Sequence, residues 1–293
     1  MTVIKTINYT VTDEDNGKKI KSILKLRLDI SSSVLTELKK QCGAILLNGK
    51  EVFATAIAKE NDVISITLKD KKSPNIEAVD LPLDIIYEDE DLLIINKPRL
   101  MPSHPSQNHH NDTLANGVMF KYKDDSFTFR IITRLDKNTS GIVVVAKNKI
   151  CASKLTKQMV CGQIQKEYLA ICHGIPQNKE DIIDAPIKRK DGSLIQREVS
   201  PNGKEAITQY EVISSKDNLS LVKIKPITGR THQIRVHLSY IGNAIYGDDM
   251  YGPDAKDANC LLHCRKISFF HPETGKKISF EAKVPKDMEF ITK

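Results

Sequence analysis

The chain has 293 residues, of which 40% are hydrophobic and 28% are charged. Such a composition is ordinary for a soluble globular protein, and the length allows one large domain or two unequal ones. The net charge of +7 favours a polyanionic partner, although many proteins without such a partner are equally basic. No apolar run approaches the length of a membrane span, and the first residues lack the apolar core of a signal peptide. We therefore expect a cytoplasmic protein without a membrane partner.

The six cysteines show no spacing typical of a disulfide framework, which favours reduced thiols. The closest approach to a metal site is Cys260, His263 and Cys264. If residues 261–270 form a strand, however, His263 and Cys264 face opposite ways. We expect buried thiols here and no metal.

The first 70 residues predict a small unit of two helices and several short strands. Apolar spacing predicts a helix over residues 20–28 and a second one between the serines 31–33 and Gly43. Asn48-Gly49 is the strongest short signal of a hairpin turn. The expected strands cover residues 1–12, 44–47, 50–53 and 63–68.

Two basic helices followed by such a hairpin and a closing strand resemble the S4-like RNA-binding domain. The resemblance implies that basic side chains of this unit contact structured RNA, namely those of Lys18, Lys21, Lys25, Arg27, Lys39 and Lys40. The alternative is that these side chains only solvate the outer faces of the helices.

A polar segment over residues 71–82 is expected to link this unit to a larger domain over residues 83–293. In that domain helices and strands mix without a regular βαβ repeat, which predicts an α+β fold. The predicted strands cover residues 83–87, 92–95, 142–146, 166–172, 206–213, 219–224 and 261–270. Helices are predicted over 151–162 and after the turn at 226–229, and residues 188–192 form an exposed basic hairpin tip.

The stretch Arg134-Leu135-Asp136, followed by Thr139-Ser140-Gly141, places one carboxylate in a loop before a buried strand. Alone, it is equally well an ordinary polar turn. Two further motifs follow it, Lys166 to Ala170 (KEYLA) and Gly229 to His237 (GRTHQIRVH). In this order the three motifs resemble those of the RluA-type family of RNA pseudouridine synthases, and Asn96-Lys97-Pro98 is a further match to that family. The family fold implied is a catalytic domain with a largely antiparallel or mixed central sheet.

The resemblance implies that Asp136 is the catalytic carboxylate, with the guanidinium of Arg235 beside it and Tyr168 stacked on the target uracil. Arg134 is expected to fill the space left by the flipped base or to hold a flanking phosphate, and Arg230 to bind RNA. His232 and His237 are expected to be mainly structural. The chain departs from the family pattern at Thr133, where His is common, and at Arg99-Leu100, where a small residue and Gly are common.

The isomerisation of uridine to pseudouridine requires no cofactor or metal, and the sequence offers no dinucleotide or phosphate-loop motif. The expected partner is 23S ribosomal RNA or the assembling large ribosomal subunit. One alternative is a transfer-RNA synthase of the same family. Another is a non-catalytic RNA-binding or ribosome-assembly factor, against which the intact set of Asp136, Tyr168 and Arg235 argues. A glycoside hydrolase would need a second catalytic carboxylate, and no motif offers one.

Overall fold

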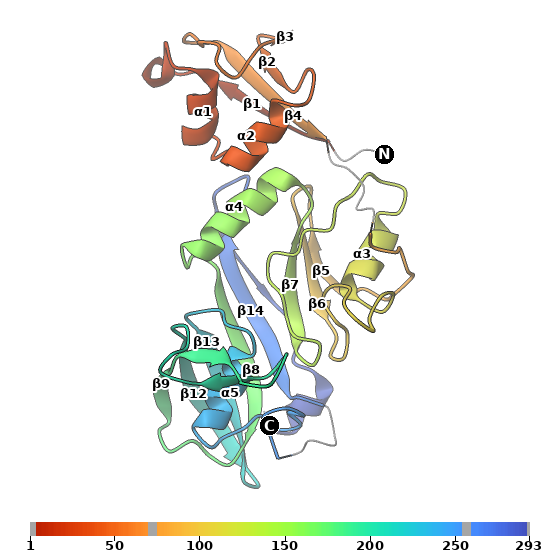
Figure 1. The fold of residues 1–293 in the computed structure, drawn as a ribbon, viewed down its shortest axis with the longest axis vertical. Coiled ribbons are helices and arrows are strands. Elements are labelled where there is room, and N and C mark those ends of the chain that lie inside the picture. The colour runs from red at the N-terminus through yellow and green to blue at the C-terminus, as the bar shows by residue number, and fades with distance from the viewer. Residues whose placement is uncertain (1–3, 70–74, 254–258, 292–293) are drawn as a thin grey trace.

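The computed structural model describes residues 4–69, 75–253 and 259–291 (Figure 1). A small N-terminal unit sits at one end of the molecule, above a larger unit built on a long sheet. No helix in these described ranges is long and apolar enough to cross a membrane. The same ranges contain no group of three His, Cys, Asp or Glu side chains arranged to hold a metal ion.

The N-terminal unit is a four-stranded antiparallel sheet with two short helices packed on it. The helices are α1 (Ile20–Leu26) and α2 (Ser32–Leu38), preceded by a 3-10 turn, η1 (Asp13–Asp15). The sheet order is β1-β4-β2-β3, from β1 (Ile4–Thr10), β2 (Ile45–Leu47), β3 (Lys50–Glu51) and β4 (Val63–Lys69). The apolar faces of the helices and of the sheet form a separate core, which includes Ile20, Leu24, Val34, Leu38, Ile64 and Ile66.

Two local signals explain why these elements form where they do. The hydroxyl of Ser31 accepts the backbone N–H of Val34 at 3.3 Å and so caps α2. Asn48 and Gly49 have φ of 50° and 78°, as a two-residue hairpin turn requires. Helix α2 ends at Leu38, five residues before Gly43, the predicted stop.

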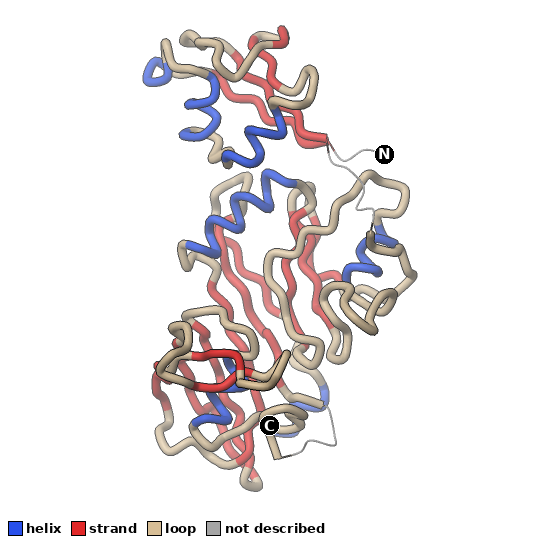
Figure 2. Tube along the Cα trace, viewed as in Figure 1, coloured by secondary structure: helices blue, strands red, loops and turns tan. Residues whose placement is uncertain are grey.

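The larger unit is a nine-stranded mixed sheet in the described part of the chain (Figure 2). Its order is β5-β6-β7-β14-β8-β13-β12-β9, and β15 also pairs with β14. Only the pair β7–β14 is parallel among these strands. The strands are β5 (Ile85–Glu88), β6 (Leu92–Lys97), β7 (Ser140–Ala146), β8 (Gln165–His173), β9 (Glu180–Asp184), β12 (Ile207–Lys216), β13 (Leu219–Pro226), β14 (Leu262–Phe270) and β15 (Lys277–Glu281).

Three helices accompany this sheet: α3 (Leu114–Lys121), α4 (Lys149–Val160) and α5 (Gln233–Tyr240). A separate hairpin, β10 (Ile187–Arg189) with β11 (Arg197–Val199), lies in front of the lower half of the sheet in Figure 1, and a 3-10 segment, η2 (Lys286–Ile291), ends the chain. The mixed central sheet and the α+β class are confirmed. Helix α3 was not predicted. Residues 71–74, the start of the predicted linker over 71–82, lie outside the described residues.

Helix α4 of the larger unit packs against the N-terminal unit. Ile150 of α4 is buried in the core of the N-terminal unit. Lys149 pairs with Glu37, and Lys157 pairs with Asp29 at 2.6 Å. Lys5 also reaches across to Asp91 at 3.1 Å. The N-terminal unit is therefore docked on the larger unit by apolar burial and by ion pairs.

Candidate functional site

Asp136 lies in the loop that precedes β7, and hydrogen bonds from buried side chains hold this loop in place. The carbonyl of Leu135 accepts the hydroxyl of Ser103 at 2.7 Å. The fully buried ammonium of Lys97 donates to the carbonyl of Lys137 at 3.3 Å. Burial lowers the pKa of Lys97 to about 7, against the opposing effect of the Asp136 carboxylate. The side chain of Asp136 itself keeps 35% of its surface exposed, so that it is held in place and still accessible.

Thr133 and Gly141 show how the loop is fitted to the sheet. The hydroxyl of Thr133, the residue that departs from the family pattern, accepts the backbone N–H of Val144 at 3.0 Å. Gly141 has φ of 111°, and a Cβ on it would lie 2.2 Å from the carbonyl oxygen of Cys264 in β14. Only glycine allows β14 to approach the loop this closely.

Tyr168 projects from β8 toward the same place and is 6% exposed. Burial, then the thiol of Cys264, then the carboxylate of Asp136 raise its pKa well above the ordinary value for tyrosine. The phenol therefore stays protonated at neutral pH. Its electrostatic interaction with Asp136 links two residues that are 32 positions apart in the sequence.

Arg235 lies on α5 and is almost fully buried. Its guanidinium makes a two-pronged contact with Asp248, at 2.7 Å and 2.6 Å, and a third hydrogen bond to Asp249 at 3.0 Å. Burial alone would raise the pKa of Asp248, but the guanidinium of Arg235 holds it below its usual range. Asp249 in turn accepts the side-chain amide of Asn138, in the Asp136 loop, at 3.3 Å.

The hydrogen bonds of Arg235 to Asp248 and Asp249 use its Nε and Nη2 atoms, so its main ion pair in the structure is with Asp248. The expected pairing of Arg235 with Asp136 is left to Nη1 and stays a prediction. Arg235 still acts on Asp136 electrostatically, because the two charges influence each other across the site. In the described part of the chain, the imidazole of His232 lies within 4.0 Å of the Asp136 carboxylate.

The sequence did not predict that His232 and Tyr251 belong to the site. The imidazole Nε2 of His232 lies 3.9 Å from Oδ2 of Asp136, and its Nδ1 lies 2.8 Å from the hydroxyl of Tyr251. The expectation of a mainly structural role therefore fits His237 better. His237 bonds the backbone carbonyl of Ala185 at 2.9 Å and the hydroxyl of Thr208 at 2.9 Å. Position within the GRTHQIRVH motif was the only available signal for His232.

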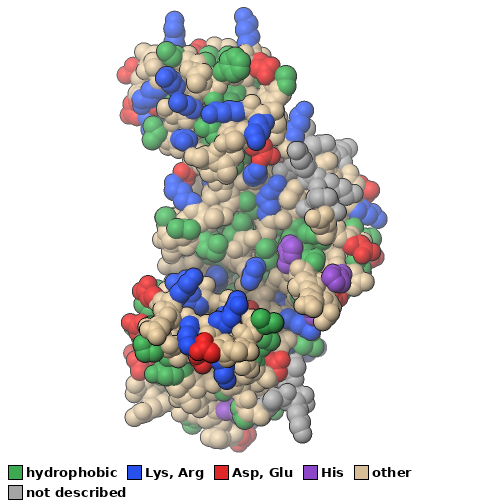
Figure 3. Space-filling view, in the orientation of Figure 1, with side chains coloured by type: hydrophobic (Ala, Val, Ile, Leu, Met, Phe, Trp, Pro, Cys, Tyr) green, Lys and Arg blue, Asp and Glu red, His purple; other side chains and the backbone are tan. Residues whose placement is uncertain are grey.

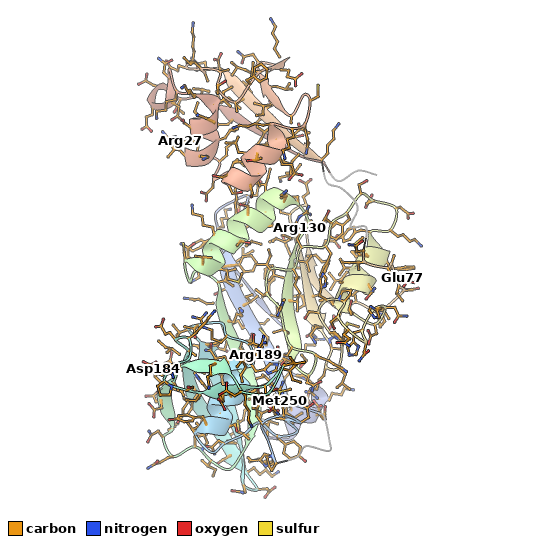
Figure 4. All side chains as sticks on the ribbon, viewed as in Figure 1. Arg27, Glu77, Arg130, Asp184, Arg189 and Met250 are labelled. Carbon is orange, nitrogen blue, oxygen red and sulfur yellow. The ribbon has the colours of Figure 1, made fainter. Side chains whose placement is uncertain are left out.

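A cavity of about 260 Å³ opens between the β10–β11 hairpin and α5, beside Tyr251. Its lining includes Lys190, Arg197 and Met250. Figure 4 labels Met250 and, on the hairpin, Arg189 in the same region of the molecule. The lining also includes Glu198 and does not include Asp136, so this cavity adjoins the site through Tyr251 and does not hold the carboxylate.

The residues predicted to bind RNA fall into two classes. Arg134, Lys25, Lys39 and Lys40 are exposed, and Lys21 is partly exposed. Others are engaged within the protein: Arg27 and Lys18 both contact the buried carboxylate of Asp15, at 2.8 Å and 3.0 Å. Arg230 is exposed, and its Nε donates to the carbonyl of Glu205 at 2.8 Å. The exposed side chains of the first class are therefore more available to bind RNA than those of the second.

Comparison with known protein families gives one match to the chain, over residues 91–240, and the matching family is described as RNA pseudouridylate synthase. The matched range contains the Asp136 loop, Tyr168 and Arg235.

Individual relatives extend this similarity over nearly the whole chain. An RNA pseudouridine synthase of Bacillus subtilis, YjbO, is 37% identical over 270 residues, which is 91% of this chain and 95% of the relative. The ribosomal large subunit pseudouridine synthase D of Vibrio cholerae is 34% identical and covers 98% of this chain and 94% of its own length. Among solved structures, human RNA pseudouridylate synthase domain containing 1 is 26% identical, with a TM-score of 0.59 over 69% of this chain and 83% of that one.

Proposed function

Since this chain belongs to the RNA pseudouridine synthase family, its reaction is the isomerisation of uridine in RNA, and we propose that Asp136 is the catalytic carboxylate and large-subunit ribosomal RNA the substrate. The observation that carries the assignment of Asp136 is the convergence of three segments on its carboxylate. Nε2 of His232, at the start of α5, lies 3.9 Å from Oδ2 of Asp136, and Tyr168 of β8 and the buried Lys97 of β6 interact with it electrostatically.

In the reaction the bond between N1 and C1′ breaks, the uracil turns, and C5 bonds to C1′. C5 loses one proton and N1 gains one, so the product is an isomer and no group leaves. The sugar carbon gains cationic character as the bond breaks, and a nearby carboxylate stabilises that charge, as in glycosidases. Asp136 is the exposed acidic group that the loop holds for this task.

Tyr168 fits the role of a surface for the uracil ring. Its pKa is raised far above neutral, so the ring and its hydroxyl meet the base as a neutral phenol. A buried aromatic face beside the carboxylate is what a flipped base needs in place of its lost stacking partners. Arg134 is exposed two residues before Asp136, where it can fill the vacated space in the RNA or hold a flanking phosphate.

We also propose that residues 1–70 form an S4-like RNA-binding domain, linked by residues 71–82 to a catalytic domain over residues 83–293. Two helices on a four-stranded sheet, with exposed Lys25, Lys39 and Lys40, support this assignment. Figure 3 shows Lys and Arg side chains on the visible face of this unit and again near the hairpin in the lower half. Two separate basic regions suit a large structured RNA better than a short one.

Site-resolved mapping of pseudouridine in all cellular RNA, with and without this protein, tests the substrate. We expect specific uridines of large-subunit ribosomal RNA to lose the modification when the protein is absent, and its return when the gene is restored. Loss confined to transfer RNA would replace the proposed substrate with the alternative within the same family. A pseudouridine map that is the same with and without the protein would contradict both substrates.

A further inference from the structure

A chain of polar contacts leads from the β10–β11 hairpin to the carboxylate of Asp136. The backbone N–H of Arg197, in β11, donates to the hydroxyl of Tyr251 at 2.8 Å. The same hydroxyl lies 2.8 Å from Nδ1 of His232, and Nε2 of His232 lies 3.9 Å from Asp136. The imidazole therefore stands between a tyrosine that contacts one nitrogen and a carboxylate that faces the other.

Both ends of this chain select the same form of the imidazole. The Tyr251 oxygen already accepts one hydrogen bond from Arg197, which leaves the phenolic proton for Nδ1 of His232. At the other end, a carboxylate attracts an N–H and repels a nitrogen lone pair. Burial and the nearby Arg235 and Arg197 lower the pKa of His232, against the opposing effect of Asp136, so the ring is neutral. A neutral ring with its proton on Nε2 meets both demands.

The backbone at His232 adds an independent observation. Its φ of 57° and ψ of 17° place it in the left-handed region, at the N-cap of α5. Glycine and asparagine adopt this region at least as readily as histidine does. The backbone thus gives no reason for a histidine here, whereas the reach of an imidazole to Asp136 does.

We propose that His232 is a positioning residue for Asp136, and that Tyr251 fixes its Nε2–H tautomer and ties it to the RNA-facing hairpin. This proposal rests on the proposed catalytic role of Asp136. The Nε2–H of His232 then limits the orientations of the carboxylate. At 3.9 Å the two groups are just beyond hydrogen-bond distance, so a movement of about 1 Å on RNA docking completes the contact.

Matched substitutions at position 232 separate positioning from a backbone role. His232→Gln places an amide N–H near the position of Nε2, whereas His232→Asn suits the left-handed backbone better but does not reach Asp136. With saturating RNA, we expect kcat of His232→Gln within about threefold of the wild type and that of His232→Asn to fall by roughly tenfold to a hundredfold, with KM nearly unchanged. Equal activities, or a more active Asn variant, would overturn the proposal.

The tautomer itself is measured by nitrogen-15 NMR of the imidazoles in the full-length protein, with the His232→Asn spectrum identifying the signal of His232. We expect the Nε2–H form in the wild type and a mixture with Nδ1–H in Tyr251→Phe, together with a kcat lower by about tenfold. Tyr87→Phe, which removes a hydroxyl of the edge strand β5 that bonds Asp89, serves as the control with unchanged kcat. An Nδ1–H ring in the wild type would refute the proposal without any variant.

The proposed function fails separately from this inference. Turnover by Asp136→Asn would remove the catalytic role of Asp136, whereas the tautomer of His232 is observed whether or not the protein is active.

Discussion

The guanidinium of Arg235 makes three hydrogen bonds to the carboxylates of Asp248 and Asp249 and lies 5.2 Å above the centre of the Tyr251 ring. Arg235 therefore holds Asp249 and Tyr251 in place. Asp249 accepts a hydrogen bond from Asn138 of the Asp136 loop, and the hydroxyl of Tyr251 contacts His232. At the scale of single residues, Asp136 is thus placed by a connected set of charges and not by one ionic partner.

Asp248→Asn should destabilise the protein strongly at neutral pH, because it leaves the buried charge of Arg235 without its main partner. Breaking a buried ion pair in this way costs about 3–5 kcal/mol. The pKa of Asp248 is lowered in the folded state, so its contribution is complete above the unfolded pKa of about 4 and is lost as the pH falls through the folded pKa. Urea unfolding at several pH values should therefore show a gap between wild type and variant that narrows only below about pH 4.

Asp191→Asn is the matched control for this measurement. Asp191 pairs with Lys188 at the exposed hairpin tip, where its side chain is 90% exposed. A surface pair of this kind contributes little, so we expect a change within about 0.5 kcal/mol at every pH. A stability gap for Asp248→Asn that stays the same from pH 7 to pH 3 would contradict the ion-pair argument.

At the scale of secondary structure elements, the site depends on the parallel contact of β7 with β14. This contact covers only Ser140 and Gly141 on one strand and His263 and Cys264 on the other. It brings Cys264 of β14, which pairs with Tyr168 of β8, next to the Asp136 loop. The strand pairing therefore sets the distance between the carboxylate and the phenol.

Gly141→Ala should break this contact. Its Cβ would meet the backbone of Cys264, and φ of 111° is strained for any L side chain. We expect a loss of about 3 kcal/mol in the free energy of unfolding, measured by urea denaturation. Gly192→Ala has a φ of 75° but no atom within 4 Å of the new Cβ, so it should cost only about 1–2 kcal/mol from the backbone. Similar losses for the two variants would show that the close approach of β14 is unimportant.

Local signals predicted many of these elements from the sequence. Ser31 as an N-cap, the Asn48-Gly49 turn and the apolar run of β7 are each decided by a few adjacent residues. Helix α3 was missed because it is only eight residues long, carries Gly117 inside it and follows a polar loop, although Thr113 and Asn116 form a capping box.

The candidate site was less predictable than the elements that carry it. The motifs named Asp136, Tyr168 and Arg235, and in the structure both Tyr168 and Arg235 interact electrostatically with Asp136. The partnership of Arg235 with Asp248 was not predictable, because the chain between them folds back through the end of α5 and a turn. The same holds for Tyr251, whose contact with His232 exists only in three dimensions.

At the scale of the whole molecule, the N-terminal unit is attached to the larger unit by Ile150 of α4 and by ion pairs, those of Lys5 with Asp91 and Glu273, Lys149 with Glu37 and Lys157 with Asp29. Such docking holds its exposed lysines at a fixed distance from the site on the larger unit. The attachment therefore suits an RNA that contacts both regions at once.

Replacing Lys25 and Lys39 together with Gln should weaken RNA binding and reduce its dependence on salt. Each phosphate contact that is lost lowers the slope of log affinity against log salt by about 0.7–0.9. Replacing the exposed Lys179 and Lys216, at the far end of the larger unit, is the matched control with the same change of charge. Filter binding over a range of salt concentrations measures both. Equal effects would indicate that net charge alone matters and that the N-terminal unit has no special role.

The central claim is that Asp136 carries the chemistry, and turnover by purified Asp136→Asn on a ribosomal RNA substrate tests it most directly. The amide keeps the size and polarity of the side chain but cannot stabilise a positive sugar carbon as a carboxylate does. We predict no detectable pseudouridine, with RNA affinity within about twofold of the wild type, since no phosphate contact is lost. Substantial turnover by the folded variant would contradict the assignment of Asp136.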